Sequence, residues 1–375
     1  MIKKREIDSF DTKLEDRKEF IAAVKELKEL NIIDYEALKG YEKENLFEAI
    51  WLVLTDDSLL KAYNKAKRIP LLEKINTLIT LLTSYHFEKE ELSSFINKQV
   101  IDIKTKLKIT RFFTLEAQLN EDIFKALVFM DQNRDETLER VLSTSLYHDS
   151  KRFERVVKAK VVSILKAIFK ENYEEGLSEE QLLTEYGIVR YPEIFEFCGL
   201  IKLTIRGCVI DYSSLLSGAY LNGEDAKELT CCTSSCRRVL FIENKANYIA
   251  YIKTKREDEL VVYHGGFFSP MKKLFFTQLY KGLTKLEFYH WSDIDLGGFR
   301  LFTRLKKEII PTLKPYKMDK QTLLLNKALL ISITDNSYLL MLEQLLALKE
   351  CEVFYDLINT MLTLKVKMEQ ESLLL

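Results

Sequence analysis

The chain has 375 residues, of which 47% are hydrophobic and 30% charged, a balance typical of folded globular proteins. Lysine and arginine total 56 and aspartate and glutamate total 57, so the net charge of -1 excludes binding to a polyanion through overall charge, and any nucleic-acid surface must be local. The amino terminus lacks the apolar core of a signal peptide, and no apolar run reaches the length of a membrane helix. We therefore expect a cytoplasmic, multidomain protein with no membrane segment.

The first part of the chain, residues 1–104, predicts an all-α amino-terminal domain. Apolar side chains recur there at spacings of three and four, with lysine and glutamate between them, as in amphipathic helices. The clearest stripes run from Phe20 to Leu30 and from Leu71 to Leu82. Pro70 precedes the second stripe at a position that suits the first turn of a helix.

Residues 105–230 predict a winged-helix-like domain, in which helices precede a β-hairpin. The segment 149–170 places seven lysines and arginines against two acidic residues on a helix whose other face is apolar. The string IKLTIRGCVIDYS then predicts two strands joined at Arg206-Gly207. This is the order of a winged-helix module, which lays a helix or wing along DNA. The candidates for contact with phosphates are Lys151, Arg152, Arg155 and Lys158, although a solvated basic face is the competing interpretation.

Residues 231–325 predict an α/β domain with a parallel sheet, followed by a carboxyl-terminal helical segment, residues 326–375. Apolar runs at 239–242, 260–263 and 286–289 alternate with amphipathic helices, so the strands should be parallel and joined by right-handed crossovers. The complete fold prediction is an α+β multidomain protein. Sheets of this type place their chemistry at the carboxyl ends of the strands.

Acidic residues follow two of these predicted strands. Glu243 follows the first, and Asp293 and Asp295, which project from the same face of an extended segment, follow the third. Gly297 and Gly298 then allow the backbone to turn into the next helix. If the first and third strands are neighbours, three carboxylates meet, and they repel each other unless a cation lies among them. Oxygen ligands suit Mg²⁺ or Mn²⁺.

Two histidines lie near these predicted strand ends. His264, which precedes two glycines at the end of the second apolar run, is a further candidate for contact with a phosphate of DNA. His290 is expected to pack beneath the site.

The motifs carry a resemblance to known families. FIEN followed by a helix, with a later Asp-x-Asp and glycine behind it, is similar to the Toprim fold of topoisomerases, bacterial primases and several nucleases. The strings YHWSDIDLGGFRLFTRLK, YHGGF, HDSKRFERV, GIVRYPEIFEFCGLIKL and KMEQES resemble the JetD family, the nuclease subunits of Wadjet plasmid-defence systems. The resemblance covers residues 140–371. It implies a homodimeric, metal-dependent DNA endonuclease to which an SMC-type, condensin-like complex brings plasmid DNA.

The resemblance also implies roles for individual residues. Glu243 matches the acidic residue after the first strand, and Asp293 with Asp295 matches the paired aspartates. These three would be catalytic residues that bind Mg²⁺ or Mn²⁺ during in-line attack of water on a phosphodiester. Asp319 and Glu371 would be secondary metal ligands. Ser292 departs from the family pattern, which usually has glycine there, and the resemblance does not extend to the first hundred residues.

Two other functions compete with this interpretation. A DNA strand transferase of the topoisomerase VI type also combines a winged helix with Toprim, and it requires a nucleophilic tyrosine, for which Tyr147 is the nearest candidate. The second is a catalytically inactive subunit that binds DNA or an SMC complex. Trapping of a covalent adduct would favour the first, and lack of metal binding the second.

Overall fold

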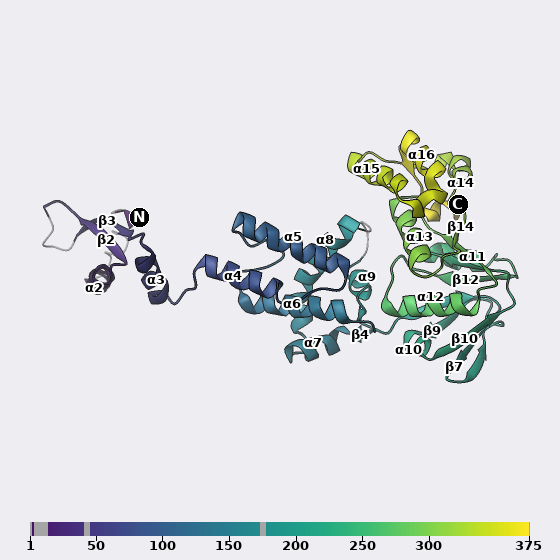
Figure 1. The fold of residues 1–375 in the computed structure, drawn as a ribbon, viewed down its shortest axis with the longest axis horizontal. Coiled ribbons are helices and arrows are strands. Elements are labelled where there is room, and N and C mark those ends of the chain that lie inside the picture. Colours follow the sequence, from purple (N-terminus) through teal and green to yellow (C-terminus); the bar gives the residue numbers. More distant parts are fainter. Residues whose placement is uncertain (1, 4–13, 41–45, 173–177, 375) are drawn as a thin grey trace. The chain divides into compact units, whose positions relative to one another are not determined.

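The computed structural model shows an α+β protein whose contacts divide it into two compact units (Figure 1). The described residues are 2–3, 14–40, 46–172 and 178–374. The smaller unit comprises Met1–Thr80 and Ile103–Lys108, and the larger comprises Leu81–Asp102 and Ile109–Leu375. None of the helices in these described ranges is long and apolar enough to cross a bilayer.

The smaller unit contains a sheet, so the prediction of an all-α region over residues 1–104 was wrong. Three antiparallel strands have the order β1-β3-β2, and Val24, Ile33 and Ile50 are buried together where α2 packs on them. Strands this short show little alternation against the helical spacing around them. Both predicted helical stripes are confirmed, as α2 and α4. The elements are β1 (Ile2–Lys3), α2 (Leu14–Glu29), β2 (Ile33–Ala37), β3 (Phe47–Leu52), α3 (Asp56–Lys65) and α4 (Leu71–Leu82).

The larger unit begins with helices that include the predicted basic segment. The apolar face of that segment is buried as predicted, with Phe153, Val157 and Val161 fully inaccessible. The segment starts with one π-helical turn, a rare element that widens the helix locally. The elements are α5 (Glu90–Lys106), α6 (Ala117–Gln132), β4 (Thr137–Leu138), α7 (Glu139–Tyr147), η3 (Phe153–Val157), α8 (Lys158–Asn172), α9 (Glu179–Thr184) and β5 (Ile188–Val189).

The predicted hairpin is also present, as β7 (Ile201–Ile205) and β8 (Cys208–Asp211), which pair in antiparallel orientation. Arg206 and Gly207 join its strands with φ of 50° and 79°, the positive values that a two-residue hairpin turn requires. After α10 (Gly223–Lys227), β10 (Leu229–Ser234) pairs with β7 to give a three-stranded sheet of order β10-β7-β8. The hairpin thus pairs with β10 rather than with β4 or β5.

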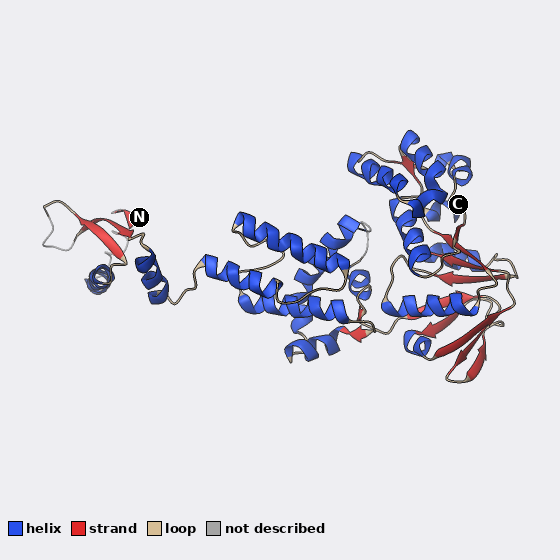
Figure 2. Cartoon of the chain, viewed as in Figure 1, coloured by secondary structure: helices blue, strands red, loops and turns tan. Residues whose placement is uncertain are grey.

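A six-stranded sheet of order β14-β13-β11-β12-β6-β9 forms the centre of the larger unit (Figure 2). The three predicted parallel strands are confirmed as β11, β12 and β13, with β11 in the middle. β14 is also parallel, whereas β6 and β9 are antiparallel, so the sheet is mixed and includes strands that precede residue 231. The strands are β6 (Ile194–Cys198), β9 (Ala219–Asn222), β11 (Arg238–Ile242), β12 (Glu259–Tyr263), β13 (Glu287–Trp291) and β14 (Lys314–Pro315).

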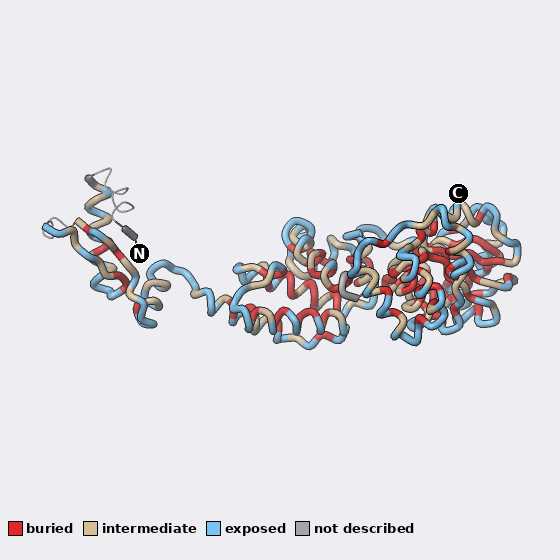
Figure 3. The backbone as a smooth tube through the Cα atoms, turned by 90° about the horizontal axis from the view of Figure 1, so that it is seen from above, coloured by how far each residue is buried: buried red, intermediate tan, exposed pale blue. Residues whose placement is uncertain are grey.

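Helices pack on both faces of this sheet, because successive side chains of a strand point to opposite faces. On one face, Tyr251 of α11 makes an edge contact with Trp291 of β13, with 5.9 Å between ring centroids. On the other, Phe276 of α12 contacts Phe241 of β11 at 4.8 Å. Figure 3 shows the buried residues concentrated in these strands and in the helices that cover them. The helices are α11 (Lys245–Ile252), α12 (Pro270–Gly282) and α13 (Leu296–Glu308).

The last part of the chain consists of short helices that pack on α13. Phe354 lies 4.7 Å from Phe299 and 4.8 Å from Phe302 between ring centroids. The elements are α14 (Lys320–Leu325), η4 (Lys327–Leu329), β15 (Ile331–Ser332), α15 (Asn336–Gln344), η5 (Leu345–Ala347), η6 (Lys349–Phe354), α16 (Tyr355–Leu364), β16 (Val366–Lys367) and η7 (Gln370–Leu374).

Candidate functional site

The structure brings the three predicted carboxylates to one rim of the sheet. β11 and β13 are neighbours, and the backbone N–H of Glu243, just after β11, donates to the carbonyl of Trp291 at the end of β13 at 3.0 Å. Glu243, Asp293 and Asp295 line the same cavity, which has a volume of about 540 Å³. The strand order therefore places these side chains as the sequence predicted.

Two glycines let the backbone approach this rim closely. Gly266 has a φ of +72°, and a Cβ atom there would lie 3.2 Å from Oε1 of Glu243. A Cβ on Gly298 would lie 2.1 Å from the carbonyl oxygen of Asp293. Because that oxygen belongs to the backbone, no change of side-chain rotamer could relieve the clash. The glycine after the Asp-x-Asp motif is thus required by the tight passage from β13 into α13.

Asp295 is fixed at the amino end of α13. Its Oδ1 accepts a hydrogen bond from the backbone N–H of Gly298 at 2.8 Å, which makes Asp295 the N-cap of the helix. Burial nevertheless raises the pKa of this carboxyl above its ordinary value, and the capping bond opposes that shift only in part. One carboxylate oxygen of Asp295 therefore caps α13, while the residue also lines the cavity.

A segment close to the end of the chain closes the rim from the other side. Ile294 and Met368 form an antiparallel bridge through two backbone hydrogen bonds of 2.9 and 3.1 Å. This bridge brings Glu369 and Glu371 to Asp293, and one carboxylate oxygen from each of the three lies within 4.8 Å of the others. Glu371 was a predicted secondary ligand. Glu369 was not predicted, although it stands two positions earlier in the same KMEQES motif.

The five carboxylates Glu243, Asp293, Asp295, Glu369 and Glu371 are called the acidic rim below. Burial, together with the charge of Asp295, raises the pKa of Asp293 to about 7. The ammonium group of Lys367 lies 2.9 Å from Glu369, and the nearby acids raise the pKa of that lysine. The crowding of carboxylates at partly buried positions favours a hard divalent cation among them.

Asp319, the other predicted secondary ligand, lies elsewhere. Its Oδ1 accepts a hydrogen bond from the backbone N–H of Thr322 at 2.7 Å and so caps α14. It lines a different cavity, together with Lys320 and Asp356. The sequence could not separate this N-cap aspartate from a ligand, since both follow a short strand.

The prediction that His264 contacts a phosphate does not fit its surroundings, because its side chain is completely buried. Its Nδ1 accepts a hydrogen bond from the backbone N–H of Gly266 at 3.2 Å, and burial holds its pKa well below the ordinary value. His290 is equally buried, as expected, and burial lowers its pKa to about 3. Both rings are neutral parts of the core under the acidic rim.

The loop between β12 and α12, which carries the glycine that approaches the acidic rim, is held by buried polar groups: the backbone N–H of Phe268 donates to Oε1 of Glu185 at 2.5 Å. The guanidinium of Arg304 donates to both carboxylate oxygens of Glu185, at 3.1 and 2.8 Å. Nζ of Lys272 donates to the carbonyl of His264 at 2.8 Å and lies 3.9 Å from Glu193. The end of α9 and the segment after it are thereby tied to the loop beside the acidic rim.

The four lysines and arginines that were predicted to contact DNA divide into two kinds. Arg152 lies 2.5 Å from the buried carboxylate of Asp122, and Lys158 lies 2.5 Å from Glu139. Lys151 and Arg155 are exposed. The two paired side chains would have to give up internal partners to bind phosphate, which leaves Lys151 and Arg155 as the better candidates.

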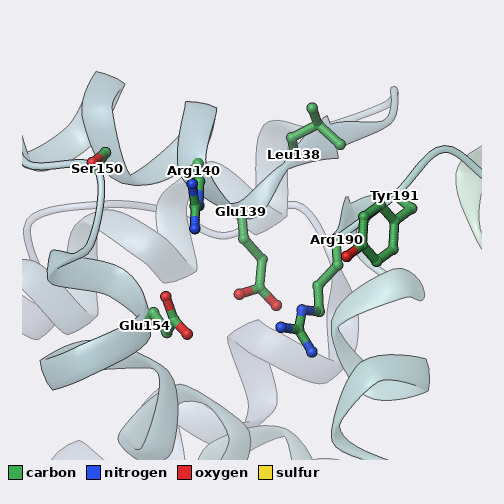
Figure 4. Close-up of a pocket in the computed structure, with 7 residues that line it drawn as sticks. All are labelled: Leu138, Glu139, Arg140, Ser150, Glu154, Arg190 and Tyr191. Carbon is green, nitrogen blue, oxygen red and sulfur yellow. The ribbon is translucent and has the colours of Figure 1, made fainter.

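A cavity of about 340 Å³ lies beside this basic segment (Figure 4). Glu139 and Glu154 face the same space as Arg140 and Arg190, so its charges balance. It therefore adds no cationic pocket for a phosphate.

Tyr147, the nucleophile that a strand transferase would need, is engaged in the helical part. Its hydroxyl donates to the backbone carbonyl of Asp122 at 2.8 Å, and burial raises its pKa. A tyrosine nucleophile must reach DNA and lose its proton readily. The hydrogen bond of Tyr147 to the Asp122 carbonyl and its raised pKa both oppose such a role.

The fold and the acidic rim define an α+β protein with an oxygen-donor site suited to a divalent cation. Residues 211–375, which contain the whole acidic rim, match the family model for the carboxyl-terminal part of Wadjet protein JetD. The chain is also 27% identical over 361 residues to the Wadjet protein JetD of Bacillus cereus (strain Q1), an alignment that covers 95% of this chain and 85% of that protein. Together these matches support the JetD family for this chain.

Proposed function

We propose that this chain is a subunit of a Wadjet system and acts as a Mg²⁺- or Mn²⁺-dependent endonuclease that cleaves phosphodiester bonds of plasmid DNA through a Toprim-type domain. Similarity to JetD supports the assignment to a Wadjet system. The observation that carries the enzymatic part is the convergence of Asp293, Glu369 and Glu371, with oxygens within 4.8 Å of one another, beside Glu243.

The donor set of the acidic rim fits the proposed cation. Carboxylate oxygens are the ligands that Mg²⁺ and Mn²⁺ prefer, and the side chains of Asp293, Glu369 and Glu371 would hold the ion. The cavity next to them has room for a phosphate group and for water ligands. When bound, the cation would polarise the phosphodiester and stabilise the leaving 3′ oxygen.

The remaining residues of the rim have separate tasks in this proposal. Glu243 lies against Gly266 and would orient the attacking water and accept its proton. Asp295 would contribute a carboxylate oxygen to the cation site while its other oxygen caps α13. Because α13 starts there, its amino end also adds positive potential next to the phosphate.

The setting of the reaction is part of the same proposal. Residues 105–230, with their helices and the β7–β8 hairpin, would act as a winged-helix-like module that holds the DNA backbone, with Lys151 and Arg155 on its exposed face. An SMC-type complex would deliver the DNA, and the chain would work as a homodimer. These partners are inferred from the resemblance to JetD.

The test is cleavage of supercoiled plasmid by the purified full-length protein with Mg²⁺ or Mn²⁺. Glu243→Gln keeps the size of the side chain and removes its negative charge, so we expect a loss of cleavage of about 100- to 10,000-fold, as for loss of a general base. Asp319→Asn is the matched control: it changes an acid outside the acidic rim and keeps the cap of α14, and it should cleave normally.

Each other outcome has a definite meaning. Cleavage by Glu243→Gln at the rate of the unchanged protein would contradict the assigned site. Absence of both cleavage and Mn²⁺ binding in the unchanged protein would favour a catalytically inactive subunit. A covalent adduct between protein and DNA after denaturation would favour a strand transferase.

A further inference from the structure

Gln370 is a buried amide that bonds to the ends of both strands carrying the acidic rim. Its side chain is 1% exposed. Its Nε2 donates to the carbonyl of Trp291 at 3.0 Å, and its Oε1 accepts from the backbone N–H of Asn244 at 3.0 Å. Trp291 ends β13 and Asn244 follows Glu243, so one side chain spans the two strand ends. Figure 1 shows this end of the chain beside α11.

The backbone of Gln370 is bonded as completely as its side chain. Its N–H donates to Oδ1 of Asp293 at 2.5 Å, and its carbonyl accepts from Nδ2 of the buried Asn247 at 2.8 Å. Each of its polar groups therefore has a partner on β11, β13 or the segments that directly follow them. These hydrogen bonds fix the position of Gln370 relative to the acidic rim.

The two residues next to Gln370 in the sequence carry carboxylates of the acidic rim, and their placement depends on that of Gln370. Glu369 precedes it and Glu371 follows it, and both join Asp293 in the oxygen cluster. The backbone bridge from Met368 to Ile294 fixes the segment at one point only. Without the side chain of Gln370, the chain beyond that bridge would lose its bonds to the carbonyl of Trp291 and to the backbone N–H of Asn244.

We propose that Gln370 is a positioning residue for the cation site, which holds Glu369 and Glu371 at the distances from Asp293 that an ion requires. This inference rests on the proposed function, because it presupposes that the acidic rim binds a cation. The side-chain amide of Gln370 is not itself a ligand, since it bonds to the backbone of Trp291 and Asn244 and not to the carboxylate cluster.

The physical reason is the cost of ordering charged side chains. Two glutamates on a loose segment must lose conformational freedom and approach other anions before they can hold an ion. In the folded protein the four hydrogen bonds of Gln370 already restrict the segment that carries the two glutamates, so less conformational freedom is lost when the ion binds. Loss of groups that orient metal ligands typically weakens metal affinity about 10- to 100-fold, and we expect an effect of this size here.

The test is a calorimetric titration with Mn²⁺ of the full-length protein at neutral pH and low temperature, where the variants stay folded. Gln370→Met preserves the length and apolar volume of the side chain but removes both amide hydrogen bonds. Its affinity for Mn²⁺ should fall about 10- to 100-fold. Asn247→Ala, which removes only the support of the Gln370 carbonyl, should give a smaller fall in the same direction.

Two further measurements make the result specific. Gln99→Met changes another buried glutamine, 4% exposed and on α5, and should bind Mn²⁺ as the unchanged protein does. The electron paramagnetic resonance spectrum of saturated Gln370→Met should also differ from that of the unchanged protein, because the ligands are held less rigidly. A residue that contributes only stability would alter neither affinity nor spectrum in the folded state.

The outcomes distinguish this inference from the proposed function. If the unchanged protein binds no Mn²⁺, the proposed function fails first and the role of Gln370 fails with it. If the unchanged protein binds Mn²⁺ and Gln370→Met and Asn247→Ala bind it equally well, the positioning role is overturned while the cation site stands. If Gln370→Met does not fold, Asn247→Ala decides by the same titration.

Discussion

The acidic rim and the ion pairs beside α9 are two regions of the larger unit that bury carboxylates in opposite ways. Glu185 meets the guanidinium of Arg304 through both oxygens, and Glu193 lies near the ammonium of Lys272. Among the described residues that line the cavity at the acidic rim, five are acidic and two, Arg300 and Lys367, are cationic. One region is balanced by the chain itself, and the other has an excess of negative charge.

This difference indicates which region is structural and which is functional. Burial of a carboxylate is costly unless a partner compensates its charge, so a paired carboxylate can be explained by the fold alone. Among the described residues that line the cavity at the acidic rim, carboxylates outnumber cations, so pairing within this set does not account for all of them. Strongly shifted acids next to a cavity are typical of sites that bind something from solution.

The largest expected effect comes from breaking the balanced region. Glu185→Ala leaves Arg304 half-compensated in a buried position, and we expect a loss of about 3 kcal/mol in the free energy of unfolding. The measurement is urea unfolding followed by the fluorescence of Trp291 in a Trp51→Phe background. Glu180→Ala is the control, because its pair with Arg190 is exposed and worth less than about 1 kcal/mol. Equal losses in the two variants would show that burial does not decide the strength of these pairs.

The second prediction concerns the pH dependence of the acidic rim. The pKa of Asp293 is raised to about 7, above its ordinary value of 3.8, so the fold favours the neutral carboxyl. Without a cation, ionisation therefore destabilises the protein progressively from about pH 4, and fully above about pH 7. Asp293→Asn removes this penalty and should raise the melting temperature at pH 8 by several degrees but not at pH 4, since one pKa unit corresponds to about 1.4 kcal/mol.

The control for this prediction is the added ion. Mn²⁺ should raise the melting temperature of the unchanged protein at pH 8 and leave that of Asp293→Asn nearly unaltered, because the variant lacks a ligand charge. A gain in Asp293→Asn that is the same at both pH values would contradict a raised pKa.

The smallest expected effect sharpens the contrast between the two regions. Lys367 is one of the two described cationic residues that line the cavity at the acidic rim, and it would repel a bound divalent ion. Lys367→Met should therefore strengthen Mn²⁺ binding a few-fold, as expected for loss of one partly exposed charge, and slightly destabilise the ion-free protein. Isothermal calorimetry at low and high salt measures both the effect and its screening. Weaker binding in Lys367→Met would show that the lysine instead supports the ligands.

The sequence predicted those parts of the site that depend on local pattern. The apolar runs of β11, β12 and β13 are continuous, and the residues after them are polar, so strand ends could be located from residue types alone. Parallel pairing then predicted that Glu243 meets Asp293 and Asp295 if the first and third strands are neighbours, and the structure supplies that strand order. Gly298 was recognised as a turn residue, although its real constraint is the carbonyl oxygen of Asp293.

The sequence did not predict features that depend on distant contacts. Glu369 reaches the acidic rim through a bridge of one residue pair, which leaves no strand pattern to detect. His264 follows a strand just as the carboxylates do, and it is buried because rings from distant positions, among them Phe268 and Phe276, pack around it. In the smaller unit, strands of two to six residues were hidden among helical spacings.

The bonds that Gln370 makes to Asn244 and Asn247 join positions 126 and 123 residues apart in the chain. Contacts between such distant positions form late in folding, because the entropy of closing a long loop must be lost before the contacts can stabilise the protein. In a refolding experiment, tight Mn²⁺ binding should thus appear after the sheet has formed, as a slower phase than the recovery of secondary structure. The acidic rim would be a late product of folding and could not serve as a metal-bound nucleus for it.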